Sequence, residues 1–289
     1  MIKKLLGFLK KLMVQNCSLE DARKVLRERL SSEKPIMVAR FGATEIKAVL
    51  FGYFSFPFNL LVRKHSIKYM PVYSGFFPAT DIALKEFSDL MIDRMSYLDV
   101  LASWRPEEKF FKRQLNKVVK IPLPTLDPDK SEYSWTQALK GKKVLVIHPF
   151  AKTIKSQYEK NRSKIFGENS DHVLPEFASL QVIQAVQTIA GNNAGFDTWF
   201  DALAYMEREI DKCDFDVALI GCGAYGFPLA AYCKKIGKQG IHIGGPLQLY
   251  FGIKGKRWDD KGLYNEYWVA PDESEKPKNL EKVENGCYW

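Results

Sequence analysis

The segment from Asp216 to Trp258 restricts the possible folds of this chain more than any other part of its sequence. It contains two short apolar runs, Val217–Ile220 and Gly240–Ile243, and each run ends in a glycine turn. Both runs have the length of buried strands, and Phe227–Ile236 between them has the composition of a helix. The segment therefore predicts two strands that are joined by a helix and that each end in a glycine turn.

The rest of the chain repeats this alternation. Strands that alternate with helices are typical of an α/β fold with a mainly parallel sheet flanked by helices, of the Rossmann-like kind. We expect further strands at 35–41, 98–102, 118–122, 144–147 and 182–186, and further helices at 18–30, directly after Gly42, at 80–95, at 107–115, from Pro149 onward and at 198–212.

The chain has 289 residues, of which 46% are hydrophobic, so it is long enough to bury a large core. We divide it into a basic amphipathic helix (1–16), an α/β domain (17–270) and a polar C-terminal tail (271–289). Within the domain, the proline-containing segment 123–134 is the best candidate for an internal boundary. Residues 52–78 are rich in aromatic residues, glycine and proline, which predicts an irregular region with short helices.

The first 14 residues predict an amphipathic helix. At about 100° per residue, four lysines and Gly7 fall on one arc, and large apolar side chains occupy the opposite side. Two interpretations remain open: the helix lies in the headgroup region of a membrane, or it packs on the body of the protein or on a second subunit. A signal peptide is not expected, because lysines interrupt the apolar run that it would need.

The formal net charge of +9 and the pI of about 9.1 favour polyanionic partners such as nucleotide sugars and phospholipid headgroups. Nucleic acid is not expected, because the basic residues are dispersed rather than clustered with aromatic residues on one face. The five cysteines are scattered and include no CxxC pair, as is typical of a reducing cytoplasm. No apolar run reaches the ~18 residues of a membrane span. The sequence thus predicts a cytoplasmic protein that is peripheral at the inner face of the membrane.

Three glycines in the C-terminal part, Gly221, Gly223 and Gly226, match the GxGxxG spacing of dinucleotide-binding proteins. That fingerprint expects an acidic residue about 20 positions later, whereas the next strand ends in His242 and Gly244. One interpretation is a phosphate-binding turn without NAD, since a glycine turn before a helix lets backbone N–H groups approach an anion. The other is a tight strand–helix turn that needs small residues.

Polar residues follow several of the expected strands. The carboxyl ends of parallel strands share one edge of the sheet, and ligands bind there. Neither a GxSxG nor a Walker A sequence occurs, so a serine hydrolase and a P-loop NTPase are poor interpretations. The candidate residues for binding a ligand that carries phosphate are Arg40, Gly42, Thr44, Lys152, Thr153, Gly221, Gly223, Tyr225, Gly226, Gly244, Gly245, Lys254, Lys256 and Arg257.

Glu45 and His148 are the candidate catalytic residues. Glu45 follows a strand beside a glycine turn, where a carboxylate can act as a general base or a metal ligand; the alternative is a solvated glutamate in the first turn of a helix. His148 is either an acid–base group or a hydrogen-bond donor to phosphate, or it is a structural histidine at a strand–helix junction. The cations at 254–257 likewise either neutralise a phosphate or belong to a solvated loop.

Two of these regions together resemble the GT-D class of glycosyltransferases and its relatives in bacterial surface-polysaccharide gene clusters. In that class an early strand ends in a motif of the RFGDGE type, whose two acids serve the metal and the nucleotide sugar. The segment VARFGATEI (38–46) keeps Arg40, Gly42 and Glu45 but has Ala43 where the first acid would stand. The segments GCGAYG and IHIGG are similar to the second nucleotide-facing region of the class, and the resemblance extends over most of the chain from Pro35 onward.

The resemblance implies a glycosyltransferase that moves a sugar from a nucleoside-diphosphate donor, foremost a UDP-sugar, to a lipid-linked or polysaccharide acceptor in cell-surface glycan synthesis. Glu45 would serve as base or as a ligand of Mg²⁺ or Mn²⁺. With the first acid replaced, lysine or arginine neutralising the diphosphate is the alternative to a metal. The rival interpretations are a Rossmann-type oxidoreductase that binds NAD(P) or another nucleotide, and a non-enzymatic membrane-associated module.

Overall fold

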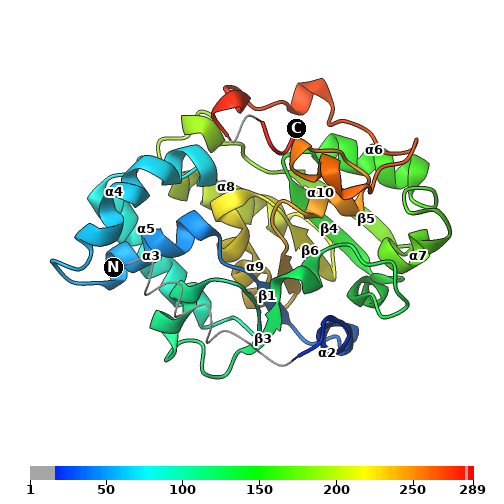
Figure 1. Cartoon of the computed structure of the whole chain (residues 1–289), viewed down its shortest axis with the longest axis horizontal. Coiled ribbons are helices and arrows are strands. Elements are labelled where there is room, and N and C mark those ends of the chain that lie inside the picture. The colour runs from blue at the N-terminus through cyan, green and yellow to red at the C-terminus, as the bar shows by residue number, and fades with distance from the viewer. Residues whose placement is uncertain (1–16, 284–285) are drawn as a thin grey trace.

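The computed structural model describes residues 17–283 and 286–289, and it contains a single sheet of seven parallel strands (Figure 1). The strand order is β3-β2-β1-β7-β6-β4-β5, which confirms the expected Rossmann-like α/β fold. The strands are β1 (Ile36–Ala39), β2 (Val100–Ser103), β3 (Val119–Pro122), β4 (Lys143–His148), β5 (Ser179–Gln184), β6 (Val217–Ile220) and β7 (Gln239–His242).

Helices cover both faces of the sheet (Figure 1). Successive strand side chains point to opposite faces, so each strand contributes to two cores. Met37 and Ala39 of β1 join the core formed with α3, α5, α8 and α9, whereas Ile36 and Val38 join the core formed with α2, α6 and α10. The helices are α2 (Leu19–Ser31), α3 (Ala43–Tyr53), α4 (Leu60–Tyr69), α5 (Asp81–Met95), α6 (Ala151–Asn161), α7 (Ser170–Val173), α8 (Trp199–Asp211), α9 (Gly226–Lys235) and α10 (Leu247–Tyr250).

Most of the predicted elements are confirmed to within a few residues. Two helix starts follow from capping chemistry: Ser18 caps α2 and Thr198 caps α8, each by accepting a backbone N–H from an aspartate three residues later. The predicted irregular region contains α4 and a short π-helix, Met70–Ser74.

Three predicted elements differ from the structure. The expected helix at 107–115 is a 3₁₀ helix, Pro106–Phe111, and the expected strand at 182–186 begins earlier, at Ser179. The helix expected from Pro149 begins at Ala151, so this proline lies before the helix and not in its first turn. Phe150 is the N-cap residue of that helix and offers no side-chain hydrogen bond. Another group must therefore accept hydrogen bonds from the first backbone N–H groups of the helix.

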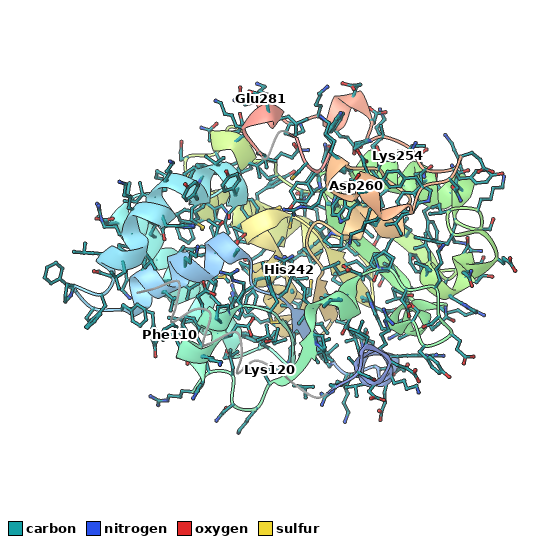
Figure 2. The ribbon with its side chains drawn as sticks, viewed as in Figure 1. Phe110, Lys120, His242, Lys254, Asp260 and Glu281 are labelled. Carbon is teal, nitrogen blue, oxygen red and sulfur yellow. The ribbon has the colours of Figure 1, made fainter. Side chains whose placement is uncertain are left out.

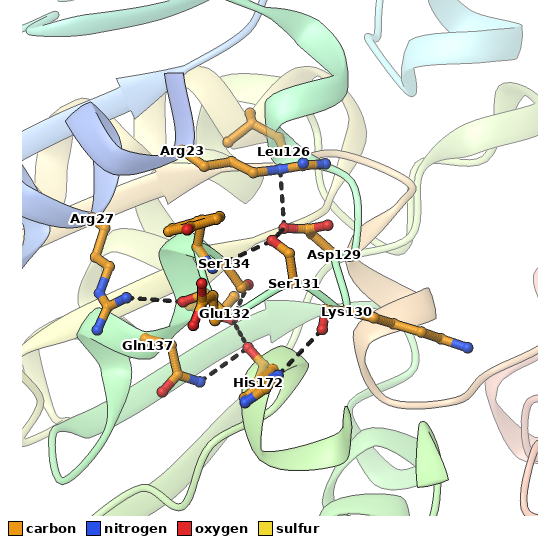
Figure 3. Close-up of polar contacts among 12 residues, drawn as sticks. Arg23, Arg27, Leu126, Asp129, Lys130, Ser131, Glu132, Ser134, Gln137 and His172 are labelled. Atoms are coloured by element: carbon orange, nitrogen blue, oxygen red, sulfur yellow. Dashed lines mark hydrogen bonds and ion pairs between the residues drawn. The ribbon is translucent and has the colours of Figure 1, made fainter. Parts of the chain in front are cut away.

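The segment 123–134 connects β3 and β4, which belong to the same sheet. Figure 3 shows how it is held: Arg23 of α2 forms an ion pair with Asp129 at 3.2 Å, and the His172 ring of α7 donates to the Lys130 carbonyl oxygen at 3.2 Å. The segment therefore joins the two halves of one sheet and is fixed to the helices on either side of it.

The predicted tail, 271–289, packs against the body of the protein over its described residues. It forms a 3₁₀ turn at Glu273–Glu275, in which the Glu275 side chain is buried, and Val283 and Cys287 are buried as well. The tail is consequently part of the folded structure and reaches the functional edge of the sheet.

The predicted amphipathic helix at 1–16 lies outside the described residues. Within residues 17–283 and 286–289, no helix is both long enough and apolar enough to span a bilayer.

Candidate functional site

A cavity of about 270 Å³ lies at the edge of the sheet where the strands end. Its walls come from the segments that follow every strand except β3, together with the C-terminal tail. This is the edge at which parallel α/β sheets bind ligands. Of the candidate residues predicted from the sequence, those that line the cavity are Arg40, Gly42, Thr44, Glu45, His148, Gly221, Gly223, Tyr225, Gly244, Gly245 and Arg257.

Arg40 follows β1 and brings a positive charge to the cavity wall. Within residues 17–283 and 286–289, its buried Nε atom has no hydrogen-bond partner, and the one hydrogen bond of its side chain is a long one, 3.5 Å from Nη2 to the Phe41 carbonyl oxygen. Among the described residues, no carboxylate lies within ion-pair distance of its guanidinium group. Burial lowers the pKa of Arg40, and the Glu45 carboxylate nearby opposes this shift. A partly buried cation with donors to spare is suited to an anionic ligand.

The Arg40 guanidinium is positioned by its neighbours. It lies over the Trp104 ring, 5.2 Å from the ring centre, and the Trp104 Nε1–H donates to the Phe41 carbonyl oxygen at 2.7 Å. On another side it approaches the β7 turn, where a Cβ added to Gly244 would be 3.3 Å from Arg40 Nη1. Trp104 therefore links the end of β2 to the end of β1 and supports the cation.

Glu45 lies in the first turn of α3 and lines the cavity with Thr44. Its carboxylate folds back over the helix start so closely that a Cβ at Gly42 would be 1.7 Å from Oε2. Glycine at position 42 lets the carboxylate lie directly against the helix start, whereas a larger residue there would displace the end of this side chain. Within the described part of the chain, no hydrogen bond engages the Glu45 carboxylate, which leaves it available to a ligand.

His148 ends β4 and is buried at the cavity wall. Burial lowers its pKa to about 3, so the imidazole is neutral at physiological pH. Its Nδ1 accepts the Phe150 backbone N–H at 3.0 Å, and the ring proton must therefore be on Nε2. His148 presents a neutral hydrogen-bond donor.

His242 ends β7 and lines the same cavity. Its pKa is also lowered to about 3, first by burial and then by the charge of Arg40. Nδ1 lies 3.1 Å from the Arg40 carbonyl oxygen, which can only accept, so Nδ1 carries the proton and Nε2 is an acceptor. The two buried histidines thus have opposite tautomers.

Gly226 makes room for the second of these rings. A Cβ at this position would be 2.4 Å from His242 Nε2, which is too close for any side chain at position 226. Gly226, which was expected to bind phosphate, does not line the cavity. Its requirement for glycine follows from the imidazole.

The glycine turns after β6 and β7 contact each other. Gly223 and Gly244 have φ values of +58° and +81°, which favour glycine. A Cβ at Gly221 would be 2.8 Å from the Gly244 carbonyl oxygen, so the two turns can approach only without side chains. α9 begins after the first turn with neither a side-chain cap nor an acidic residue in its first turn. Such a helix start favours an anion.

The contacts of Tyr225 indicate a structural role. Its ring stacks on Trp199 at 4.9 Å between centroids, and its hydroxyl lies 2.9 Å from Thr188 Oγ1. The Thr188 hydroxyl donates to the Gly75 carbonyl oxygen at 2.6 Å, so Tyr225 donates to Thr188. Burial raises the pKa of this tyrosine. The contact fixes the turn after β6 to the π-helix region.

The basic side chains at 254–257, predicted to bind phosphate, do not converge on one site in the structure. Only Arg257 lines the cavity, where its Nη1 donates to the Tyr288 hydroxyl at 2.7 Å. The Tyr288 ring covers Gly245, since a Cβ there would be 2.4 Å from Cε1. Lys254 lies near the Tyr264 ring instead, and Figure 2 shows it toward the periphery while His242 is near the centre of the molecule. Lys256 is exposed and outside the cavity wall.

Lys152 and Thr153 contact the C-terminal tail and not the cavity. The Glu275 carboxylate accepts the backbone N–H of Lys152 at 2.7 Å and that of Thr153 at 3.2 Å, and it also accepts the Thr153 hydroxyl at 2.5 Å. The first turn of α6 therefore already holds a negative group, supplied by the chain itself. A phosphate has no role left at this helix start.

The residues of the cavity wall that the sequence did not predict include Trp104, His242 and Tyr288. The first two follow from strand register, because Trp104 comes directly after β2 and His242 is the last residue of β7. Tyr288 carries no such signal, since it arrives from a tail whose path depends on tertiary packing.

The residues present do not build a metal site of their own. Across residues 17–283 and 286–289, no group of three or more histidine, cysteine, aspartate or glutamate side chains converges. Glu45 is the one carboxylate among the described residues of the cavity wall, and Arg40 is its charged neighbour.

Fold and site define a Rossmann-like α/β protein with a cavity at the carboxyl edge of its sheet. Comparison with protein-family models, with curated proteins and with solved structures finds no match.

Proposed function

We propose that this chain is a glycosyltransferase that moves a sugar from a nucleoside-diphosphate donor, foremost a UDP-sugar, to a lipid-linked or polysaccharide acceptor. The observation that carries the proposal is Arg40, a cation on the cavity wall whose buried Nε has no partner among the residues that the structure describes. A diphosphate would supply the missing acceptors.

The charge of the cavity supports an anionic ligand. Among the described residues of its wall, Arg40 and Arg257 are the cations and Glu45 is the only acid. The start of α9, reached through the Gly223 turn, adds the partial positive charge of a helix N-terminus. We place the diphosphate between Arg40 and this turn.

The neutral groups of the wall suit the rest of the donor. His148 Nε2–H donates to an oxygen of the diphosphate or sugar, and His242 Nε2 accepts a hydroxyl of the sugar or ribose. A cavity that offers both a fixed donor and a fixed acceptor recognises polyhydroxylated ligands by hydrogen bonding.

In the proposed reaction the acceptor hydroxyl attacks the anomeric carbon while the bond from that carbon to the diphosphate oxygen breaks. Glu45 takes the proton of the hydroxyl, and the electron pair of the broken bond leaves with the nucleoside diphosphate. Positive charge develops on the sugar, as in glycoside hydrolysis. Arg40 stabilises the leaving diphosphate.

The proposed setting is the cytoplasmic face of a membrane, where a lipid-linked acceptor resides. The basic amphipathic sequence at 1–14 and the net charge of +9 support it.

A thermal-shift screen tests the proposal. UDP, several UDP-sugars, inorganic phosphate and NADH are added separately to the purified protein. At 100 times its dissociation constant, a ligand stabilises the folded state by about 2.7 kcal/mol. We expect stabilisation by UDP-sugars and UDP, but not by phosphate alone. Stabilisation by NADH without any response to UDP-sugars would favour a Rossmann-type oxidoreductase and reject the transferase.

A further inference from the structure

The loop between α3 and α4, together with the first turn of α4, exposes four large apolar side chains. Phe56 is 77% exposed, Phe58 64%, Leu61 63% and Leu60 51%. In Figure 1 this loop projects at the left edge of the molecule. We call these four residues the α3–α4 tip. Four large apolar side chains exposed within six residues of the chain mark an interaction site more often than a free surface.

The surroundings of the tip are positively charged. From Ile46 to Thr80 the chain contains no aspartate or glutamate, while it contains Lys47, Arg63, Lys64 and Lys68. Arg63 pairs with Asp81 at 2.9 Å, and the other three are lysines. Within residues 46–80 the charges are therefore all positive. The acids that face them from other elements are Asp81, which pairs with Arg63, and Glu107, whose charge acts on Lys47 and His65.

The helix α4 places this charge beside the tip in a regular order. Leu60, Lys64 and Lys68 are spaced by four residues, so they follow one another along one side of the helix, and both lysines are exposed. At 1.5 Å per residue, Lys68 is about 12 Å from Leu60 along the helix axis. Apolar groups at one end and cations farther along match the depth profile of a membrane interface.

We infer that the α3–α4 tip is a docking surface for an anionic lipid bilayer, with Phe56, Phe58 and Leu61 in the interface and Lys64 and Lys68 among the headgroups. Charge selects this partner over two others. The N-terminal segment of the chain brings four lysines, and a second copy of the same face brings the same cations, so both would be repelled. Anionic headgroups are attracted.

The surface is also continuous with the cavity. His65, Tyr69 and Tyr73 contact each other in sequence along α4 and the following π-helix, at 4.7 Å and 5.6 Å between centroids. Tyr73 is 41% exposed and lines the cavity. A bilayer at the tip would hold lipid headgroups at the side from which Tyr73 borders the cavity.

Co-sedimentation of the full-length chain with vesicles tests the inference. The vesicles contain phosphatidylglycerol and phosphatidylcholine in equal parts, or phosphatidylcholine alone, and carry no glycan, so the result is independent of the proposed function. One variant combines Phe56→Ser, Phe58→Ser and Leu61→Ser, and another combines Lys64→Gln and Lys68→Gln. The matched controls are Ile236→Ser, an exposed apolar residue after α9, and Lys160→Gln on α6.

We expect the tip variant to bind phosphatidylglycerol vesicles at least about tenfold more weakly, with an unchanged melting temperature, because the removed side chains are exposed. The lysine variant should be weaker at low salt and approach the wild type at high salt, because the attraction is screened. Both controls should bind as the wild type does.

Three results would overturn the inference. Vesicle binding by the tip variant as strong as that of the wild type would exclude a lipid bilayer as the partner of this surface. A smaller mass of the tip variant in light scattering would assign the surface to a second copy of the chain. A melting temperature lowered by the tip substitutions would mean that another part of the chain covers these residues.

Discussion

Two buried histidines give the cavity a donor and an acceptor at fixed positions. The Phe150 backbone N–H fixes the tautomer of His148, and the Arg40 carbonyl oxygen fixes that of His242. Both rings are neutral because burial lowers their pKa to about 3. Neither imidazole is suited to act as a cationic acid in the unliganded protein, so Glu45 is the better candidate for proton transfer.

The depressed histidine pKa values predict a pH dependence of stability. The unfolded chain takes up protons as the pH falls below about 6.5, whereas the folded state does not until about pH 3. The free energy of unfolding should therefore fall by up to about 1.4 kcal/mol per pH unit for each ring below pH 6.5. Urea unfolding at several pH values down to about pH 5 measures this slope. His148→Gln should remove one ring's share of the slope. Equal slopes for His148→Gln and the wild type would contradict the burial argument.

Substitution of Glu45 separates chemistry from binding. Glu45→Gln removes the proposed base with almost no change of volume, so sugar transfer should fall by at least about 100-fold. Donor binding and the melting temperature should stay close to those of the wild type. The measurement is the rate of UDP release from the UDP-sugar that stabilises the protein. Wild-type turnover by the folded variant would exclude Glu45 as the base.

At the scale of elements, the start of α6 depends on a residue more than 100 positions away. Its own N-cap residue, Phe150, provides no side-chain acceptor, and the Glu275 carboxylate accepts from both Lys152 and Thr153. The tail is held on the body by this buried contact. It also brings Tyr288 to the cavity wall, so the tail belongs to the site.

Weakening this contact should destabilise the fold. Glu275→Gln replaces a buried carboxylate, which accepts three hydrogen bonds, by an amide with one acceptor oxygen. We expect a loss of about 1–3 kcal/mol in the free energy of unfolding. Thermal unfolding measures it, with the exposed Glu281→Gln as control (Figure 2). If the two variants melt together at the wild-type temperature, Glu275 does not cap α6.

The same contact explains what the sequence could and could not predict. Strand and helix positions follow from local patterns, and the residues that end β1, β4, β6 and β7 meet at one edge because the strands are parallel. Lys152 and Thr153 have the right local position for a phosphate site, yet a distant carboxylate occupies that place. The pairing of Glu275 with α6 has no local signal, and neither has the approach of Tyr288 to Gly245.

At the scale of the whole molecule, the cavity and the α3–α4 tip are connected through the π-helix that follows α4. The proposed enzyme thus has a site for a charged, soluble donor next to a surface for the membrane that holds its acceptor. The amphipathic sequence at 1–14 would add a second membrane contact, and two weak contacts on one chain reinforce each other.

If the chain has two membrane contacts, removing both should reduce vesicle binding by more than the sum of the two separate losses. Deletion of residues 1–14 should weaken binding to anionic vesicles, and combining the deletion with the tip substitutions should abolish it. Donor binding should survive in both variants, because both retain Arg40 and Glu45. Vesicle co-sedimentation at two salt concentrations measures the effect. If the deletion lowers the melting temperature without changing vesicle binding, the N-terminal segment packs on the protein instead.

The most direct test of a donor site at Arg40 is titration calorimetry with the stabilising UDP-sugar. Arg40→Gln should weaken binding by about 2 kcal/mol, roughly a 30-fold rise in Kd, because the variant loses charged hydrogen bonds to the diphosphate. Its melting temperature without ligand should not fall, since the buried Nε of this arginine has no hydrogen-bond partner in the described part of the chain. Arg29→Gln, an exposed residue of α2, changes the net charge equally and should bind as the wild type does. Equal affinities of Arg40→Gln and the wild type, or no binding of any nucleotide sugar by the wild type, would contradict the proposed site.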